Sequence, residues 1–352
     1  MAASSGEPVL FFSSIRMTDR PIVGGKGASL GELTQAGIPV PPGFVVTTAA
    51  FRSFIHGLDP AGAIEREVAG LDPDDLVKLS ETTARIRERI EAFPLPADLH
   101  GAVTAAYREL DAGSGAAVAV RSSATMEDSA EASFAGTQET FLWVLGEQAV
   151  IHYLRACWAS LYSAESVVYR RRAGLPEAGL AMGVVVQRMV DALSSGVMFT
   201  RSPTTGDRSV IAVEGSWGLG SCVVSGEVTP DKFVVNKVTG EVVQRTVSRK
   251  EIEHVADFTA GGVRVTPVPA DRREVPCIDP AMLNALVALG RRIEAHYGTP
   301  QDIEWAVGRE TSEIFILQSR PETVWWSREQ AVSTGPAAKP FDHVFAHFGG
   351  KP

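Results

Sequence analysis

Hydrophobic and polar residues alternate most regularly in two segments near the end of the chain, residues 302–307 and 314–321. Alternation with a period of two is typical of β-strands with one buried face, and the polar segment between them predicts a hairpin centred near Glu310. The expected register sets Glu304 roughly opposite Leu317 and beside Gln318. One face then carries Glu304, Gln318 and Arg320, and the other carries Ile303, Trp305, Phe315 and Leu317.

The first half of the chain has mainly helical patterns, and the second half has mainly apolar runs of strand length. A Gly-rich turn is expected near residue 24. Helices are predicted at 29–35, within 60–110, at 147–171 and at 280–297, and strands at 44–47, 118–120, 183–190, 195–200, 209–214 and 232–235.

This order of elements predicts an α+β protein with a nucleotide-binding architecture. We expect two subdomains and a tail. Residues 1–188 form a helical part with a mixed sheet, and residues 189–326 form a second, strand-rich part. Residues 327–352 carry Pro and Gly and are predicted to be a linker or docking arm.

Composition narrows the class of protein. The 352 residues are 45% hydrophobic and 21% charged, and no apolar run is long enough to span a membrane. Three widely spaced cysteines, Cys157, Cys222 and Cys277, favour a reduced, cytoplasmic setting over a disulfide framework. The net charge of −9 argues against general nucleic-acid binding, although a locally basic cleft can still hold an anionic nucleotide.

The polar face of the predicted hairpin has the chemistry of a site for a metal-bound polyphosphate. The oxygens of Glu304 and Gln318 can ligate a hard cation such as Mg²⁺, and the Arg320 guanidinium can bind phosphate oxygens. The alternative is an amphipathic hairpin whose polar face is only solvated.

Two basic residues elsewhere are candidates for phosphate contacts. Lys26 lies in a Gly-rich segment able to approach a ligand closely. The residue directly after it is Gly27 rather than Ser or Thr, so the segment is not a Walker A loop. A plain glycine turn is the alternative. Arg121 ends a predicted strand, where ligand contacts are common, and a structural salt bridge is its alternative role.

Three further segments can contribute to a nucleotide site. Residues 132–140 are rich in small residues and predict a mobile loop over phosphates, or else an ordinary hairpin. Residues 187–190 end an apolar strand that can bond an adenine edge through its backbone, or simply belong to the core. Glu214, before a Gly-rich turn, can reach a ribose hydroxyl, although the spacing is not that of a Rossmann fingerprint.

Taken in order, these segments closely resemble the N-terminal ATP-binding module of phosphoenolpyruvate synthase and its relatives. The relatives include pyruvate phosphate dikinase, rifampin phosphotransferase and phenylphosphate synthase. The resemblance covers roughly residues 15–326. The matching motifs are residues 23–33, 40–44, 121–124, 133–136, 196–203, 217–220, 229–231 and 318–323.

The resemblance implies an ATP-grasp fold with ATP held in a cleft between two subdomains. It implies phosphate contacts from Lys26, Arg121 and Arg320, and Mg²⁺ binding by Glu304 and Gln318. The remaining positions that it implies are Gly136 and Thr137 in the phosphate-covering loop, Gln187, Arg188, Met189 and Val190 around adenine, and Glu214 at the ribose.

The implied chemistry is attack by a histidine on the β-phosphate of ATP, with release of AMP and later of phosphate. The seven histidines here lie outside the small-residue motif that carries the family's phosphohistidine. We therefore expect a histidine-bearing partner domain or subunit, which also binds a small-molecule acceptor. The ATP-binding subunit of phenylphosphate synthase is the leading specific hypothesis.

Three alternatives remain open. The chain can be the ATP-binding domain of a phosphoenolpyruvate synthase or of a rifampin phosphotransferase-like enzyme. It can be a non-catalytic, nucleotide-sensing subunit. It can also be a self-sufficient kinase, which would produce ADP. His343 and His347, four residues apart near the end, are expected to belong to a docking helix or a solvated turn rather than to a metal or phosphocarrier site.

Overall fold

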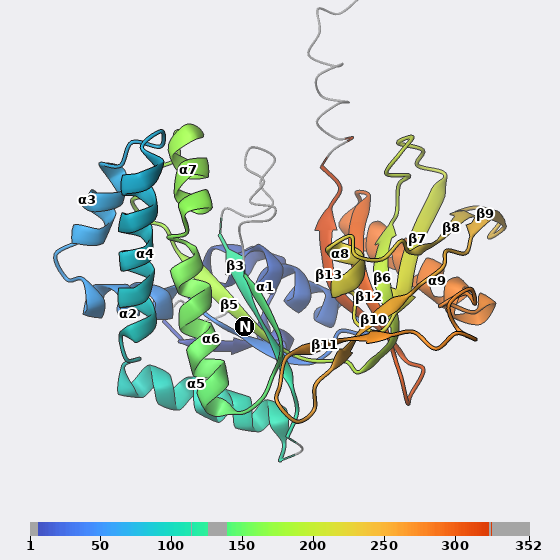
Figure 1. Cartoon of the computed structure of the whole chain (residues 1–352), viewed down its shortest axis with the longest axis horizontal. Helices are drawn as coiled ribbons and strands as arrows, with labels where there is room; N and C mark the ends of the chain where they lie inside the picture. Colours follow the sequence, from blue (N-terminus) through green and yellow to red (C-terminus); the bar gives the residue numbers. More distant parts are fainter. Residues whose placement is uncertain (1–5, 114, 126–138, 324, 326–352) are drawn as a thin grey trace, which may run out of the picture.

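Two β-sheets covered by helices stand next to each other in the computed structural model (Figure 1). The structure describes residues 6–113, 115–125, 139–323 and 325. The described strands of the first sheet lie before residue 189, and those of the second lie between residues 192 and 321. The structure therefore confirms the predicted α+β class, in the two-sheet arrangement expected of an ATP-grasp module.

The first sheet is antiparallel throughout, in the order β1-β2-β5-β3-β4. β5 lies in the middle, and its residues alternate between two apolar layers. Val184 and Val186 face one core, while Val185 faces another. The strands are β1 (Val9–Phe11), β2 (Gly43–Val46), β3 (Val118–Ala124), β4 (Thr140–Val144) and β5 (Met182–Arg188).

Helices cover both faces of this sheet. The larger core lies under the helical layer, where Phe51 and Phe54 pack on Trp158 with ring centroids 5.8 and 4.8 Å away. On the opposite face, α1 (Arg20–Gln35) packs Val23 and Leu30 against the sheet. The helices of the larger layer are α2 (Thr48–Leu58), α3 (Ala63–Ala69), α4 (Leu76–Ala92), α5 (Ala97–Asp111), α6 (Glu147–Ser160) and α7 (Ala164–Arg172).

The second sheet is also antiparallel, in the order β13-β12-β6-β7-β8-β9. It buries Trp305 against α9 (Pro280–Tyr297), the helix predicted at 280–297. Asp279 caps that helix by accepting the Met282 N–H, and Gly298 ends it with a φ of 71°. The strands are β6 (Ala192–Phe199), β7 (Val210–Trp217), β8 (Asp231–Asn236), β9 (Val242–Thr246), β12 (Gln301–Gly308) and β13 (Ile314–Pro321).

A separate hairpin links the two halves. It consists of β10 (Ile252–Ala256) and β11 (Val263–Pro267), and it reaches toward the first sheet (Figure 1). At its tip the Gly262 N–H donates to the Trp143 carbonyl of β4 at 2.9 Å, and Phe258 meets the Trp143 ring edge-on. A small apolar cluster near this contact joins residues of both sheets, including Trp143 of β4 and Ala306 of β12.

The prediction of a single helix at 147–171 is wrong, because the structure has two helices there, α6 and α7. Ser163 separates them, and its hydroxyl accepts the Ser166 N–H and caps α7. The fully buried Arg170 then donates to the Leu161 carbonyl at 2.7 Å and pairs with Glu177 at 2.9 Å, which stabilises the break. Apolar spacing alone does not detect a break of this length, because a one-turn interruption keeps neighbouring helical stretches in similar phase.

The predicted register of the β12–β13 hairpin is also wrong by one residue. Glu304 lies opposite Gln318, and a β-bulge after Glu304 sets Trp305 opposite Ile316. Ile316 therefore joins Trp305 in the core, while Leu317 turns to the face that carries Glu304. Strict alternation fails here because the bulge inserts one extra residue in β13.

The subdomain boundary predicted after residue 188 remains a prediction, with β5 ending at Arg188 and β6 starting at Ala192. The predicted tail, with His343 and His347, lies outside the described residues. Within the described part of the chain, no helix is long and apolar enough to cross a membrane.

The second sheet carries a buried ion pair at the start of β8. The Lys250 ammonium lies 2.7 Å from Asp231, and both side chains are inaccessible to solvent. Asp231 also accepts the N–H groups of Ser248 and Cys277. We expect Lys250→Met to lower the free energy of unfolding by about 3 kcal/mol or more, because a buried carboxylate loses its counter-charge.

Chemical denaturation of the purified chain measures this effect. Arg249→Met is the control, because Arg249 is the neighbouring cation and is mostly exposed. We expect that variant to stay close to the wild type. Equal stability of the two variants would contradict the role assigned to Lys250.

Candidate functional site

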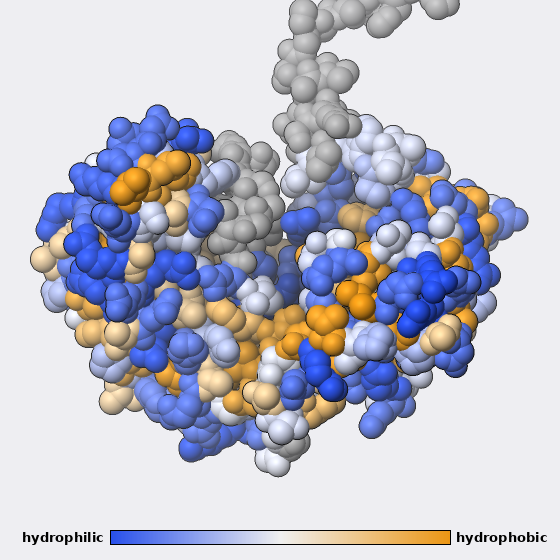
Figure 2. Space-filling view, in the orientation of Figure 1, coloured by the Kyte–Doolittle hydropathy of each residue, from blue (hydrophilic) through white to orange (hydrophobic). Residues whose placement is uncertain are grey.

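A cleft between the two sheets contains two adjoining compartments. In Figure 2 the molecule is hollowed between its lobes, and an apolar band joins the lobes below the hollow. The first compartment has a volume of about 380 Å³ and mainly apolar walls. The second has a volume of about 560 Å³ and more charged walls. Arg121, Thr140, Val224 and Glu304 line both, so the compartments meet there.

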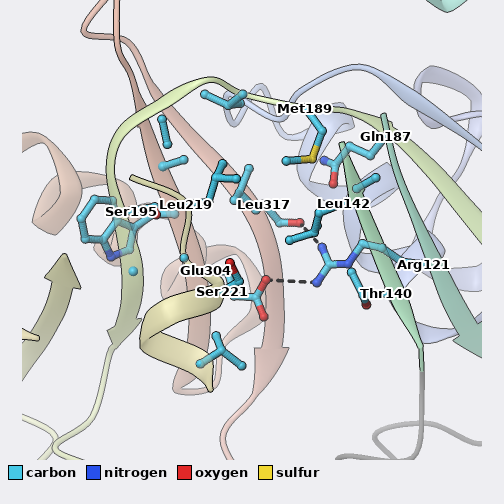
Figure 3. A pocket seen from close by; sticks show the side chains of 18 of the residues that line it. Arg121, Thr140, Leu142, Gln187, Met189, Ser195, Leu219, Ser221, Glu304 and Leu317 are labelled. Carbon is cyan, nitrogen blue, oxygen red and sulfur yellow. Dashed lines mark hydrogen bonds and ion pairs between the residues drawn. The ribbon is translucent and has the colours of Figure 1, made fainter. Parts of the chain in front are cut away.

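The apolar compartment is bounded by strand ends of both sheets (Figure 3). Leu142 of β4 and Met189, just after β5, form one wall, and Leu219 and Leu317 form the wall opposite. Leu317 lines this space because of the β-bulge. A mainly apolar compartment with a few polar groups suits an aromatic heterocycle such as a nucleotide base.

Arg121 joins the two sheets at the junction of the compartments. Its side chain extends from β3 and is mostly buried. Its Nη2 atom donates to Glu304 at 3.0 Å and to Gln318 at 2.6 Å, and its Nη1 atom donates to the Leu317 carbonyl at 3.2 Å (Figure 3). Arg121 thus forms the salt bridge expected as its alternative role, and this salt bridge, with Glu304, lies within the cleft. Nε is buried and has no hydrogen-bond partner among the described residues.

Glu304 and Gln318 fit the donor set of a hard cation. They lie directly opposite each other on β12 and β13, and one carboxylate oxygen and one amide oxygen converge on the same Arg121 nitrogen. The Arg121 guanidinium therefore places positive charge where a cation would contact the oxygens of Glu304 and Gln318. Among the described residues no group of three or more acidic, His or Cys side chains could hold a metal. A cation here would need further oxygens, such as those of phosphates.

A kink in α1 brings Lys26 to the polar compartment. Gly24 has a φ of 75°, and the residues after it restart the helix. The Ser123 hydroxyl donates to the Val23 carbonyl at 2.9 Å and accepts the Gly27 N–H at 3.0 Å, which ties this segment to β3. The predicted Gly-rich turn is therefore a helix break against the strand that carries Arg121.

Further charged residues line the polar compartment besides Lys26, Arg121 and Glu304. Arg320 lines it from β13 and pairs with Asp302 at 3.5 Å. Asp302 was not among the predicted residues, although it shares the face of Glu304 by alternation and the sequence could have revealed it. Glu214 of β7 lines the polar compartment rather than the apolar one, and Lys232 binds it at 3.1 Å.

The segment predicted to contact adenine lines the apolar compartment as expected. Part of its backbone is engaged within the protein, however. The Arg188 N–H donates to the Pro42 carbonyl and the Met189 N–H donates to the Ala117 carbonyl, each at 2.9 Å. The side-chain amide of Gln187 donates to the Pro41 carbonyl at 3.4 Å. Any backbone contact to a base must therefore use other groups of residues 187–190. Gly136 and Thr137 lie outside the described residues.

A short helix, α8 (Ser221–Val224), borders both compartments, the apolar one from Ser221 and both from Val224. Gly218 precedes it with a φ of 73°, and a Cβ there would lie 2.3 Å from the His254 carbonyl oxygen, so the close approach requires glycine. Burial raises the pKa of the thiol of Cys222, the buried residue of this helix. Ser221 and Leu219 were missed by sequence reasoning, because their approach to the cleft depends on β10.

Comparison with known proteins finds a matching family and sequence relatives over most of the chain. Residues 20–339 match the family described as pyruvate phosphate dikinase, AMP/ATP-binding domain. A probable phosphoenolpyruvate synthase of Methanothermobacter thermautotrophicus is 44% identical over 320 residues, which are 90% of this chain and 46% of that protein. A rifampicin phosphotransferase of Streptomyces sviceus is 44% identical over 316 residues, 90% of this chain and 36% of that protein.

The chain thus spans less than half the length of these curated relatives. Among solved structures, D-alanyl-alanine synthetase A from Vibrio cholerae aligns with a TM-score of 0.30 and 9% identity. That alignment covers 87% of this chain and 57% of the other, and a score this low supports no argument.

The Gly24 kink generates a prediction. A Cβ at this position would lie 1.9 Å from the Ser123 carbonyl oxygen, and the left-handed backbone is strained for any side chain. We expect Gly24→Ala to lower the free energy of unfolding by about 3 kcal/mol or more. Chemical denaturation measures the change.

Gly37→Ala is the matched control, because Gly37 has a φ of 67° with no atom near its Cβ position. This variant tests the cost of a positive φ without a steric clash, which we expect to be about 1 kcal/mol. If both variants lost the same amount, the close contact between α1 and β3 would not be important for stability.

Proposed function

Because the chain belongs to the pyruvate phosphate dikinase AMP/ATP-binding domain family, we propose that it binds Mg·ATP in the two-compartment cleft. In this proposal the bound ATP phosphorylates a histidine of a partner domain or subunit. The observation that carries the proposal is the meeting of Arg121 from one sheet with Glu304 and Gln318 from the other, between an apolar and a charged compartment.

The compartments divide the nucleotide between them. The base occupies the apolar slot beside Met189 and Leu317, and the phosphates extend past Arg121 into the polar compartment. Lys26 and Arg320 balance the phosphate charge together with Arg121. As the resemblance implies, we propose Gly136 and Thr137, outside the described residues, for the phosphates, Gln187, Arg188 and Val190 for the base, and Glu214 of β7 for the ribose.

Mg²⁺ fits the oxygens of Glu304 and Gln318, with the remaining ligands supplied by phosphate and water. When bound, it neutralises charge on the triphosphate. For it to reach these two oxygens, the Arg121 guanidinium has to release them and turn to the phosphates. The same side chain then serves the apo cleft as a counter-charge and the loaded cleft as a phosphate ligand.

The proposed reaction follows the family chemistry. The histidine nitrogen attacks the β-phosphorus, an N–P bond forms, and the bond from that phosphorus to the α,β-bridging oxygen breaks, so AMP leaves. Water then removes the γ-phosphate as inorganic phosphate, and the phosphohistidine transfers its phosphoryl group to a small-molecule acceptor. The chain contributes positioning and charge neutralisation through Lys26, Arg121 and Arg320.

Residues 1–188 and 189–326 are the proposed walls of the cleft, and residues 327–352 the proposed connection to the partner. The relatives named above support acceptors of the phosphoenolpyruvate synthase or rifampicin phosphotransferase class. Phenol as acceptor, through a phenylphosphate synthase, stays a prediction.

The proposal predicts magnesium-dependent ATP binding by the chain alone. Titration calorimetry should show that Glu304→Ala and Arg320→Ala each weaken binding about tenfold or more, because each removes a charged partner of the Mg·triphosphate. Glu310→Ala, an exposed carboxylate change in the turn of the same hairpin, is the control and should bind like the wild type. Absence of ATP binding by the wild type, or unchanged affinity in both cleft variants, would refute the proposal.

The identity of the nucleotide product tests the reaction. On addition of a histidine-bearing domain of a family member with its acceptor, chromatography should show AMP and phosphate as products. ADP would indicate instead a direct kinase. No turnover, with ATP binding retained, would favour a nucleotide-sensing role.

A further inference from the structure

Ser221, His254 and Glu227 lie in a line next to the cleft, joined by one hydrogen bond and one longer polar contact, and the proposed function does not use them. Nδ1 of His254 lies 2.7 Å from the Ser221 hydroxyl, and its Nε2 lies 3.4 Å from the Glu227 carboxylate. His254 is mostly buried on β10. Glu227 accepts a hydrogen bond from Ser225 at 2.7 Å, and this bond lowers the pKa of Glu227, so that its carboxylate is charged at neutral pH.

The carboxylate at one end sets the direction of every proton in the line. A carboxylate can only accept, so it favours the His254 tautomer with its proton on Nε2. Nδ1 is then a bare acceptor, and the Ser221 hydroxyl donates to it. Because its proton is used in this way, Ser221 can only accept hydrogen bonds on its remaining side.

That remaining side borders the apolar compartment, near its junction with the polar one. Ser221 lines the apolar compartment, and Val224, three residues later on the same turn of α8, lines both compartments. Figure 3 draws Ser221 on the wall that carries Glu304, across from Arg121 and Thr140. The backbone of His254 supports this position, because its carbonyl accepts the Leu219 N–H at 2.8 Å.

In a nucleotide the group between base and phosphates is the sugar. We infer that Ser221 recognises a ribose hydroxyl of the bound nucleotide, and that His254 and Glu227 are positioning residues that keep Ser221 an acceptor. This inference rests on the proposed function, since it uses the same cleft. It names the sugar as a point of selection: a ribose hydroxyl donates to Ser221, and a deoxy sugar leaves that acceptor unpaired.

The test is binding of ATP, 2′-deoxy-ATP and 3′-deoxy-ATP to the full chain, measured by calorimetry with magnesium. The wild type should bind ATP roughly five- to tenfold more tightly than one of the two analogues, which identifies the hydroxyl that is read. Ser221→Ala should weaken ATP binding by the same factor and leave the affinity for that analogue unchanged. The ratio between ATP and the analogue should therefore approach one.

Two substitutions of His254 separate positioning from packing. In His254→Asn the amide oxygen can take the place of Nδ1, so the preference for ribose should be retained within about twofold. In His254→Gln the amide reaches toward the place of Nε2, so the preference should fall as in Ser221→Ala. Thermal melts report the fold of each variant, and Ser14→Ala, a serine outside the cleft that bonds the Phe11 carbonyl, is the serine control.

Equal binding of all three nucleotides by the wild type overturns the inference, as does a Ser221→Ala variant with wild-type affinities. If His254→Asn and His254→Gln have the same sugar preference, the positioning role is refuted. In each of these cases ATP still binds, so the proposed function stands. A wild type that binds no nucleotide refutes both.

Discussion

A guanidinium buried between two sheets needs acceptors, and in this protein they come from the opposite sheet. Arg121 extends from β3, and its three described bonds end on Glu304, Gln318 and the Leu317 carbonyl of β12 and β13. Leaving a buried charge without partners costs several kcal/mol, so this contact constrains how the two walls of the cleft face each other. Two of these acceptors, the side-chain oxygens of Glu304 and Gln318, are also the oxygens that suit a cation. The same atoms therefore hold the two walls together and form the candidate cation site.

Departures from regular backbone build the rest of the cleft. The kink at Gly24 lets α1 approach β3 closely enough for Ser123 to bond both sides of the break. The bulge after Glu304 brings Leu317 to the apolar compartment and keeps Gln318 opposite Glu304. Both features cost regular hydrogen bonding locally, and both place a side chain where a regular helix or strand could not.

The hairpin β10–β11 adds a second link, at the closed side of the cleft. Its tip contacts Trp143 of the first sheet, and its first strand supports the Gly218–Ser221 segment of the second. Trp143 has a φ of 56°, a strained value for a bulky residue, and its carbonyl uses that geometry to accept the Gly262 N–H. One small element thus joins both walls and also carries His254.

The sequence by itself determined the α+β class, the family, the α9 helix and the pairing of the last two strands. These follow from local periodicity and motifs that need no distant partner. It also named Lys26, Arg121, Glu304, Gln318 and Arg320, which line one compartment in the structure. The tertiary structure alone decided the break between α6 and α7, the one-residue shift that exposes Leu317 to the cleft, and the approach of His254 to Ser221. Each of these depends on contacts between residues far apart in the chain or on a single inserted residue. The periodicity of hydrophobic positions carries no information on either.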